Sequence, residues 1–481
     1  MLRSSRIAIA AAALACAMAS ATAAQAARPQ LLRVSADGRI LTVGDRLPND
    51  LPTPVGVSVP ATSSKPVVGA VTKAIDEMRS KRQISSTRAN EALETWRAAV
   101  ATRKGLRGPG ARPLGNAIDG LSAIAARGDL TPSRLALVTL TAQRNAEYFS
   151  KAKNVPAAGQ RVQFDGSDLV WQYYPGQGLQ LQVLASFGIA NGLWRVKLKG
   201  HLRDLLDELV ALRSYRAGGV TWEYAFSFGG GRPPWTSGMS QATAVQALSR
   251  GAVLLGEPKY SRVAKAALPL FSRPAPSGVR TSTKRGPWYL MYTFDPSLRI
   301  LNGFLQTLIG LDEMRDLSGD RTADSLFRAA DPVARAAVPL YRSIGWSYYR
   351  PGVWDSLDYH SLTTGFLEEL CRRTATAVYC DTGKAFRGFM DNPPSLAVKT
   401  TKLKANRRGT VRIWVSKPSS VTLRITGPSG RLLLSRTTWT QPGVIGWALT
   451  APRGEGNLNV TLTGSDGQGH SRTIRSAIAF N

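Results

Sequence analysis

The spacing of hydrophobic residues changes abruptly at Asn392-Pro393-Pro394. Before this point, apolar residues recur at intervals of three and four, as in 86–103, which is typical of amphipathic helices. After it, apolar and polar residues alternate, as in 421–425, which is typical of half-buried strands. Helices and strands bury their apolar sides in different ways, so we predict two successive parts with separate cores.

Helical patterns recur along the first part, residues 66–392, and an extended arm is expected before it, over 27–65, where proline and turn residues are frequent. Thr131-Pro132 places a proline at a first helical position. Helices in this number cannot each bury an apolar face alone, so they must stack in a layer or close into a ring of helix pairs. The expected helices are 67–80, 86–103, 114–127, 131–150, 179–191, 202–213, 237–255, 261–271, 297–317, 322–341 and 361–374.

The second part, residues 395–481, consists of short alternating runs separated by turn residues such as those of 427–430. Short strands at this spacing predict an immunoglobulin-like β-sandwich. Two roles stay open for it, a packing or spacer module and a carbohydrate-binding module. The expected strands are 410–416, 421–425, 432–435, 444–449, 458–462 and 473–478.

The first 26 residues have the three regions of a secretory signal peptide. A basic region precedes the apolar run 7–15, and Ala24-Gln25-Ala26 fits a cleavage site. We therefore expect an exported protein that is either secreted or held in the cell envelope. Lipid anchoring at Cys16 is a less favoured alternative, and no later stretch is apolar for long enough to span a membrane.

Cys371 and Cys380 are the two cysteines that remain after removal of the signal peptide. An even pair in an exported chain predicts a disulfide. Their spacing matches no metal motif, and the chain has no G-x-S-x-G elbow, H-E-x-x-H helix, P-loop or dinucleotide fingerprint. We therefore expect no metal and no cofactor.

The chain is strongly basic, with 62 lysines and arginines against 32 acidic residues and a net charge of +30. A charge of this size raises the local concentration of anionic partners without specifying a fold. For an exported protein the expected partner is a uronic-acid-containing polysaccharide or the cell envelope, rather than nucleic acid.

Two aromatic motifs lie in the second half of the helical part. Residues 288–311 read WYLMYTFDPSLRILNGFLQTLIGL, and Asp358-Tyr359-His360 follows later. These motifs resemble the C-terminal domain of the D-glucuronyl C5-epimerases. The most specific match is the family pattern of Pro-Ser, three residues, Leu-Asn-Gly-Phe and then Leu-Ile-Gly-Leu. Shorter matches lie at 173–175, 235–242, 339–341 and 347–349, so the resemblance covers about 171–370.

The resemblance implies a mostly α fold, an (α/α) toroid or incomplete barrel of helix pairs, and an enzyme that inverts C5 of uronic acid residues in polysaccharides. Removing the C5 proton creates an enolate, so a base is needed on one face of the sugar and an acid on the other. A phenol is a poor base at neutral pH unless its pKa is lowered. The family's tyrosines correspond to Tyr292, Tyr349 and Tyr359.

Cations or N–H donors must also neutralise the substrate carboxylate as the enolate forms. His360 occupies a family position, whereas Arg299 and Arg350 are candidates because they are nearby cations. Asn302 is expected chiefly to pack its helix. The other candidate substrate-binding residues lie in the shorter matching segments and are Tyr174, Trp235 and Gln241.

Three positions depart from the family. Met291 replaces the glutamate that vertebrate members have before the tyrosine matched by Tyr292, and Arg350 replaces an aspartate. The histidine that follows Asp-Tyr-His after a short gap in the family is absent, with Thr363 nearby. These differences bear on the substrate more than on the proton chemistry.

Three other functions stay open. A uronate polysaccharide lyase would remove the same proton and then expel the C4 substituent, which creates a double bond that absorbs ultraviolet light. A non-catalytic envelope protein would bind acidic glycan. A glycoside hydrolase would use two carboxyl groups, for which the candidates are Asp355, Asp358 and Glu223.

Overall fold

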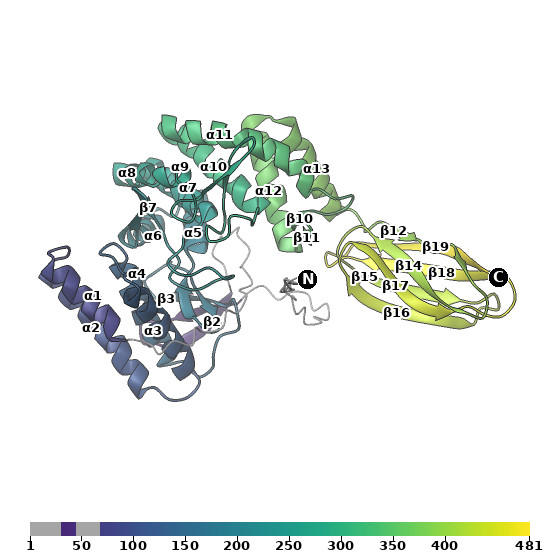
Figure 1. The fold of residues 1–481 in the computed structure, drawn as a ribbon, viewed down its shortest axis with the longest axis horizontal. Helices are drawn as coiled ribbons and strands as arrows, with labels where there is room; N and C mark the ends of the chain where they lie inside the picture. The colour runs from purple at the N-terminus through teal and green to yellow at the C-terminus, as the bar shows by residue number, and fades with distance from the viewer. Residues whose placement is uncertain (1–29, 45–67) are drawn as a thin grey trace, which may run out of the picture.

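The computed structural model describes residues 30–44 and 68–481 (Figure 1). The expected signal peptide, Cys16 and most of the expected arm lie outside the described residues. The last helix ends at Asp391 and residues 396–480 form strands, so the change of hydrophobic period marks a real change of secondary structure. Within the described ranges, no helix is both long enough and apolar enough to cross a bilayer.

The helices of the first part pack in two layers. The inner helices α5, α7, α10 and α12 contact one another in succession, and each also contacts the helix that follows it, so that α6, α8, α11 and α13 form the outer layer (Figure 1). The helices are α1 (Gly69–Ser80), α2 (Ser86–Gly105), α3 (Ala111–Ala126), α4 (Leu135–Phe149), α5 (Val183–Arg195), α6 (Lys199–Ala211), α7 (Gly238–Leu255), α8 (Pro258–Ala267), α9 (Pro269–Ser272), α10 (Leu301–Ser318), α11 (Arg321–Ala337), the 3₁₀ helix η1 (Val338–Tyr341), α12 (Leu357–Thr374) and α13 (Ala377–Asp391).

Helices α7 and α10 form the centre of the first part, because residues on all sides of both are buried. The glycine of the Leu-Ile-Gly-Leu motif, Gly310, explains their close approach. A Cβ atom at this position would lie 2.4 Å from the carbonyl oxygen of Ala242 on α7. Helix α10 begins at Leu301 rather than at the expected 297, because Asp295 accepts hydrogen bonds from the backbone and hydroxyl of Ser297 and closes a turn there.

Short strands join the helices of the first part. Strands β1 and β2 come from the expected arm, and β1 pairs in parallel with β3 in a five-stranded sheet of order β2-β1-β3-β4-β5. This sheet was not predicted, because its strands are short and the first two are separated from the other three by more than 110 residues, including four helices. The strands are β1 (Gln30–Val34), β2 (Ile40–Gly44), β3 (Arg161–Phe164), β4 (Trp171–Tyr174), β5 (Gly178–Leu181), β6 (Ser214–Arg216), β7 (Gly219–Thr221), β8 (Arg280–Thr283), β9 (Gly286–Tyr289), β10 (Tyr348–Arg350) and β11 (Val353–Trp354).

The second part has two sheets around a core of its own. One sheet has the order β12-β14-β17 and the other β13-β19-β18-β15-β16. Val411 on β14 and Val421, Leu423 and Ile425 on β15 belong to the same buried cluster, as the alternating pattern predicted. The strands are β12 (Leu396–Val398), β13 (Lys402–Leu403), β14 (Arg408–Val415), β15 (Ser419–Thr426), β16 (Leu432–Thr440), β17 (Gly443–Thr450), β18 (Gly456–Ser465) and β19 (Ser471–Phe480).

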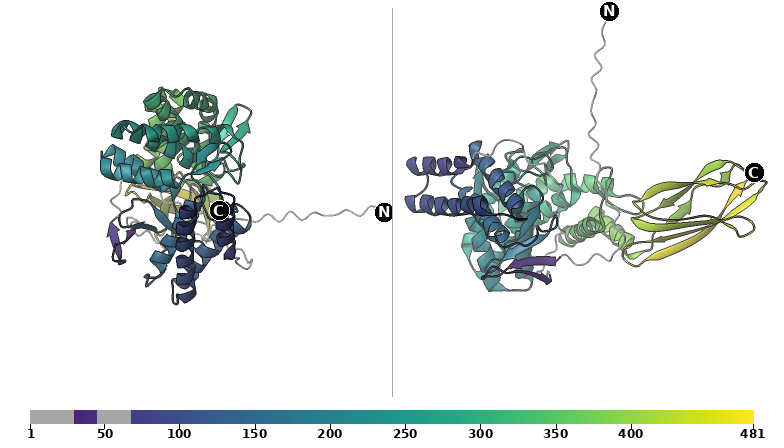
Figure 2. Two further views of the ribbon diagram at one scale, coloured as in Figure 1. Left: turned by 90° about the vertical axis from the view of Figure 1, so that its left-hand side faces the viewer. Right: turned by 90° about the horizontal axis from the view of Figure 1, so that it is seen from below.

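A buried lysine joins the two parts, which lie end to end (Figure 2). The Nζ atom of Lys417 donates to the backbone oxygens of Phe389, Met390 and Asn392 at the end of α13. Its side chain is 2% exposed and also pairs with Asp466, at 2.5 Å. A cation in this place satisfies carbonyl groups that the end of a helix leaves without intrahelical partners.

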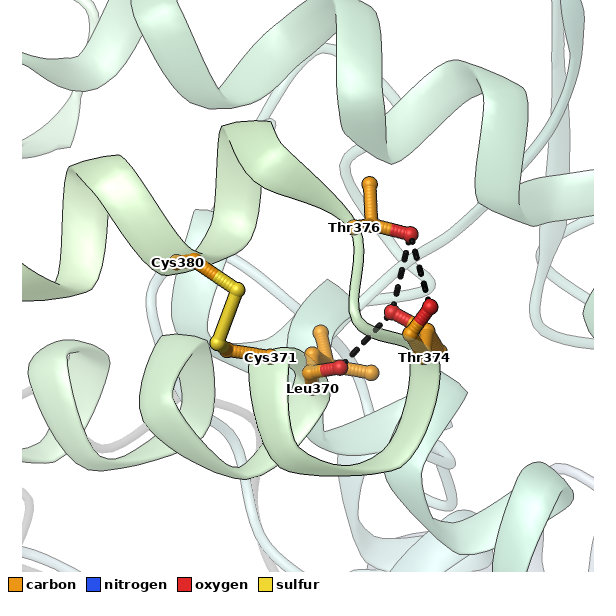
Figure 3. Close-up of a disulfide and its surroundings, with 5 residues drawn as sticks. All are labelled: Leu370, Cys371, Thr374, Thr376 and Cys380. Carbon is orange, nitrogen blue, oxygen red and sulfur yellow. Dashed lines mark hydrogen bonds between the residues drawn. A yellow bond between two sulfur atoms is a disulfide. The ribbon is translucent and has the colours of Figure 1, made fainter.

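The predicted disulfide between Cys371 and Cys380 is confirmed (Figure 3). It links α12 to α13 across the short turn at Ala375, which has a positive φ of 50°. The hydroxyl of Thr374 donates to the Leu370 carbonyl in the same turn. The bond therefore fixes the outer helix of the last pair to the helix that carries Tyr359.

Candidate active site

The three predicted tyrosines meet at one place, although they come from three separate segments. Tyr292 follows β9, Tyr349 lies on β10, and Tyr359 lies in the first turn of α12. The hydroxyl oxygens of Tyr292 and Tyr349 are 3.4 Å apart. The rings of Tyr349 and Tyr359 have centroids 5.0 Å apart. The expectation that these phenols share one site therefore agrees with the geometry.

Local capping positions Tyr359. The side chain of Ser356 caps the start of α12 by accepting a hydrogen bond from the backbone N–H of Tyr359. Serine is a favoured residue at this cap, and the acidic Asp358 in the first turn suits the helix dipole. Ser356 therefore fixes where helix α12 begins, and with it the position of Tyr359 in the first turn.

An aromatic wall surrounds Tyr292. The rings of Phe228, Phe294 and Trp235 lie 5.6, 5.7 and 6.1 Å from its ring. The cavity behind this wall is about 30 Å³, which is room for one or two water molecules but not for a sugar ring. A uronic acid residue that meets Tyr292 would therefore lie outside this cavity.

Two of the predicted substrate-binding residues are buried in this wall or behind it. Tyr174 is 4% exposed and its hydroxyl accepts a hydrogen bond from Gln182. Trp235 stacks on Tyr224, 4.2 Å between centroids, and donates to the Phe226 carbonyl. These contacts make them structural supports rather than surfaces that meet a sugar.

Gln241 and Asn302 are also buried. Gln241 is 0% exposed and donates to the Trp222 carbonyl and the Thr236 hydroxyl. Asn302 is 2% exposed on α10, next to Gly303, where a Cβ atom would lie 3.0 Å from Cβ of Met291. The expectation that Asn302 chiefly packs its helix fits this placement, and both Gln241 and Asn302 are buried.

His360 and Arg299 do not point to the tyrosines. His360 is fully buried, stacks on Trp346 at 3.9 Å, and donates from Nε2 to the Phe386 carbonyl at 3.0 Å. The guanidinium of Arg299 lies over the ring of Trp288, 5.5 Å away. Arg350 is half-buried and follows Tyr349 on β10, so it is the predicted cation that remains near the phenols.

Burial raises the pKa of all three phenols. Burial is the largest cause at Tyr292, and the hydrogen bond from Tyr349 partly offsets it. At Tyr349 and Tyr359, burial and neighbouring tyrosines raise the pKa, and the carboxyl group of Asp355 raises it further. All three phenols are therefore protonated in the free protein at neutral pH. If one of them loses its proton, Tyr292 is the one whose phenolate would accept a hydrogen bond from a neighbouring tyrosine hydroxyl.

Three buried residues that the sequence did not single out as a group support Tyr349 and Tyr359. The Ser347 hydroxyl lies 2.5 Å from Oδ2 of Asp355 and 2.6 Å from Nδ1 of His360. Together with the bond to Phe386, these contacts need three hydrogens, but a serine and a neutral histidine supply two. The third must reside on Asp355 or on His360.

The pKa shifts place this hydrogen on Asp355. Burial raises the pKa of Asp355 to about 7, and the Ser347 hydrogen bond only partly opposes this. Burial and the charges of Lys417 and Arg387 lower the pKa of His360 to about 4. Below about pH 7, a protonated Asp355 therefore donates to Ser347, which donates to a neutral His360. Residue spacing in the sequence could not reveal these hydrogen bonds, although Ser347 stands two positions before Tyr349.

Replacing Asp355 by asparagine should preserve the donor to Ser347 at every pH. In the wild type, the folded pKa of about 7 lies above the ordinary value of 3.8, so stability present below pH 4 is lost as the pH rises to 7. This loss is about 1.4 kcal/mol for each pKa unit. The stability of Asp355→Asn relative to wild type should therefore rise between pH 4 and 7 and then level off, as measured by urea unfolding.

Asp358→Asn is the control, because Asp358 is exposed at the start of the same helix. Its stability should stay within about 0.5 kcal/mol of wild type throughout this range. Parallel stability curves for wild type and Asp355→Asn would contradict a protonated Asp355.

The hydrolase candidates do not form a pair of catalytic carboxyl groups. Glu223 is 1% exposed and is held by Arg134 and Arg216. Asp355 belongs to the buried trio, and Asp358 lies in solvent at the helix start. No observation at these residues favours glycoside hydrolysis.

Comparison with known proteins identifies the segment that contains the tyrosines. Residues 217–388 match the family described as the D-glucuronyl C5-epimerase C-terminus. The chain is 32% identical over 122 residues to a D-glucuronyl C5-epimerase of Caenorhabditis elegans, which covers 23% of this chain and 20% of that protein. The chain thus matches about a fifth of the length of this relative.

A solved structure, a Cellulomonas fimi endo-beta-1,4-mannanase double mutant, matches over 63% of this chain and 74% of that chain. Its TM-score of 0.13 and identity of 11% are too low to inform the fold or the activity. The segment that matches the family, by contrast, contains Tyr292, Tyr349 and Tyr359. Residues 217–388 are therefore similar to the C-terminal domain of the D-glucuronyl C5-epimerases.

Proposed function

We propose that this protein is an exported enzyme that inverts C5 of uronic acid residues in an acidic polysaccharide. The observation that carries the proposal is the contact of 3.4 Å between the hydroxyls of Tyr292 and Tyr349, inside the segment that matches the epimerase family. Tyr359 lies beside this pair. Three phenols in one place supply both the base and the acid that inversion of a C–H centre requires.

Tyr292 is the proposed base. The hydrogen bond from Tyr349 lowers the pKa of Tyr292 against the effect of burial, so a phenolate at Tyr292 is stabilised by a neighbouring O–H group. Tyr359 is the proposed acid, since burial and the neighbouring Asp355 and Asp358 keep its hydroxyl protonated. Because burial raises the pKa of each phenol, Tyr292 must lose its proton to solvent and become a phenolate when substrate binds.

The proton transfers balance as follows. The Tyr292 phenolate takes the C5 proton, and the electron pair of the C–H bond moves into the carboxylate to give the enolate. The Tyr359 hydroxyl then gives its proton to the opposite face of C5. After the transfer, Tyr292 carries the proton taken from C5 and Tyr359 is a phenolate. Loss of the first proton to solvent and uptake of another by Tyr359 restore the starting state, and Tyr349 lies beside both phenols.

Arg350 is the proposed partner of the substrate carboxylate. The enolate carries two negative charges, and a nearby cation stabilises it as it forms. Arg350 adjoins Tyr349 on β10, whereas Arg299 and His360 have their contacts elsewhere. The family has an aspartate at this position, so Arg350 is also where a different substrate preference would arise.

The architecture also fits the proposal. The inner helices α5, α7, α10 and α12 with their outer partners suggest an arc of an (α/α) toroid over 66–392. The two C-terminal sheets suggest an immunoglobulin-like sandwich over 395–481, since their buried cluster is separate from that of the helical part. Export is supported by the Cys371–Cys380 disulfide, because such bonds persist in oxidising compartments.

The test is incubation with polyglucuronate and with polymannuronate, followed by NMR analysis of the configuration at C5. An epimerase should produce the C5 epimer without any ultraviolet absorbance from an unsaturated sugar. Rising absorbance would instead identify a lyase. If neither polymer changes while it still binds to the protein, the chain is a glycan-binding envelope protein and the proposed function is wrong.

A further inference from the structure

The outer surface of the five-stranded sheet in the second part carries rows of hydroxyl groups. Thr437, Thr422, Thr463 and Thr473 stand side by side on four adjacent strands. Thr422 and Thr437 share a hydrogen bond of 2.9 Å, and Thr463 and Thr473 share another of 2.9 Å. The residues between them along β15 point into the core, so this row faces outward.

Two arginines stand in the next row. Ser435, Arg424, Thr461 and Arg475 are aligned across the same four strands. Both arginines are exposed, and in the part of the chain that the structure describes neither forms an ion pair with a carboxylate. They lie two strands apart, about 10 Å at the backbone.

A tryptophan stands at one end of this surface. The row on the other side of the threonines is Trp439, Ser420, Ser465 and Ser471. Trp439 is 46% exposed. Together the three rows, which we call the hydroxyl face, offer hydroxyl groups, two guanidinium groups and an exposed indole ring.

Charge indicates what binds there. Residues 395–481 contain 13 lysines and arginines but two acidic residues, an excess of 11 positive charges. One of the two acidic residues, Asp466, is already paired with Lys417. A polyanion is therefore the complementary partner, and arginine forks suit carboxylate groups in particular.

We infer that the hydroxyl face holds an anionic polysaccharide. Arg424 and Arg475 would pair with carboxylates of the chain, the serine and threonine hydroxyls would exchange hydrogen bonds with sugar hydroxyls, and Trp439 would stack against a sugar ring. Rows of short hydroxyl side chains on a sheet give an extended site for a polymer rather than a pocket for a single sugar.

The position of Trp439 connects this face to the tyrosines. Trp439 and Gln468 line a cavity of about 210 Å³ together with Ser356 and Leu357. Ser356 caps helix α12, which carries Tyr359 three residues later. A polymer held on the hydroxyl face would therefore end beside the helix start that positions the proposed acid.

The test compares two double variants of the full chain. Arg424→Ser with Arg475→Ser removes two charges from the hydroxyl face and keeps it polar. Arg408→Ser with Arg412→Ser removes two exposed charges from β14 in the opposite sheet. Binding of end-labelled polyglucuronate, measured by fluorescence anisotropy, should weaken about tenfold for the first pair and less than about twofold for the second.

Two further comparisons complete the test. Trp439→Ala should weaken binding of polyglucuronate and of a neutral glucan alike, whereas the Arg424 and Arg475 variant should affect polyglucuronate alone. Equal losses for both double variants, no loss for either, or a parallel loss for single-stranded DNA of matched charge would show non-specific attraction and overturn the inference. Because binding is measured without turnover, the result stands whether or not the protein proves to be an epimerase.

Discussion

Tyr359→Phe is expected to abolish inversion at C5 while the fold and the binding of polymer survive. The substitution keeps the aromatic ring, which lies 5.0 Å from that of Tyr349, and removes the hydroxyl that would give its proton to C5. Loss of a proton donor of this kind typically slows a reaction about 10²–10⁴-fold. The rate of appearance of the C5 epimer, followed by NMR, is the measurement.

A mechanism with one tyrosine on each face of the sugar predicts a second property of the Tyr359→Phe variant. Tyr292 would still remove and return a proton on its own face of the sugar. In deuterated water, one of the two epimers should therefore exchange its C5 proton without inverting. Tyr292→Phe should stop this exchange for the same epimer, because it removes the base itself.

Tyr348→Phe is the matched control. Tyr348 neighbours Tyr349 in the sequence but stacks on Trp354, with ring centroids 4.3 Å apart, so its hydroxyl has no part in the proposed proton transfers. Its activity should equal that of the wild type. Inversion by Tyr359→Phe at more than about a tenth of the wild-type rate would remove Tyr359 from the mechanism.

Lys417→Met is expected to destabilise the junction between the helical and the strand parts by about 3–5 kcal/mol. Asp466 is 4% exposed at its side chain, and the substitution would leave it buried without its cation. It would also leave the carbonyls of Phe389, Met390 and Asn392 without their donor. Scanning calorimetry should show a lower unfolding temperature for the variant.

The Lys417–Asp466 pair should also contribute to the pH dependence of stability. Burial raises the pKa of Asp466, but hydrogen bonds from Lys417 and His470 outweigh it and hold that pKa below its ordinary value of 3.8. The stability that comes from a lowered carboxyl pKa is present above pH 4 and is lost as the pH falls through the folded pKa. Lys417→Met should therefore be less sensitive to acid than the wild type.

Lys417→Met with Asp466→Asn is the control for the cause of the loss. Removing both charges should restore part of the stability, because no uncompensated charge then stays buried. If Lys417→Met alone unfolds within about 0.5 kcal/mol of the wild type, the buried pair does not hold the two parts together.

Periodicity and motifs predicted the large features of the fold for identifiable reasons. The helix and strand patterns depend on residues that are close in sequence, so the change after Pro394 could be read directly. Gly310 could be recognised within a motif, although its contact with Ala242 became visible only in the packing of α7 against α10. The pairing of β1 with β3 joins residues more than 120 positions apart, which no local pattern reports.

The grouping of the three phenols could be predicted from motifs, but the residues around them could not. Tyr292, Tyr349 and Tyr359 stand in motifs, and the structure brings them together. His360 stands in the same motif as Tyr359, but the next position on a helix points about 100° away, and here it points into the core. The link of Ser347 to Asp355 and His360 became recognisable only through hydrogen bonds that depend on the folded loop.

Tyr292, Tyr349 and Tyr359 are expected to exchange the C5 proton of a uronic acid residue with solvent. Incubation of the wild-type protein with polyglucuronate in deuterated water, followed by NMR at C5, tests it most directly. Deuterium at C5 and the inverted epimer should appear together, and no unsaturated sugar should form. Bound polyglucuronate that keeps its C5 proton after long incubation would contradict it.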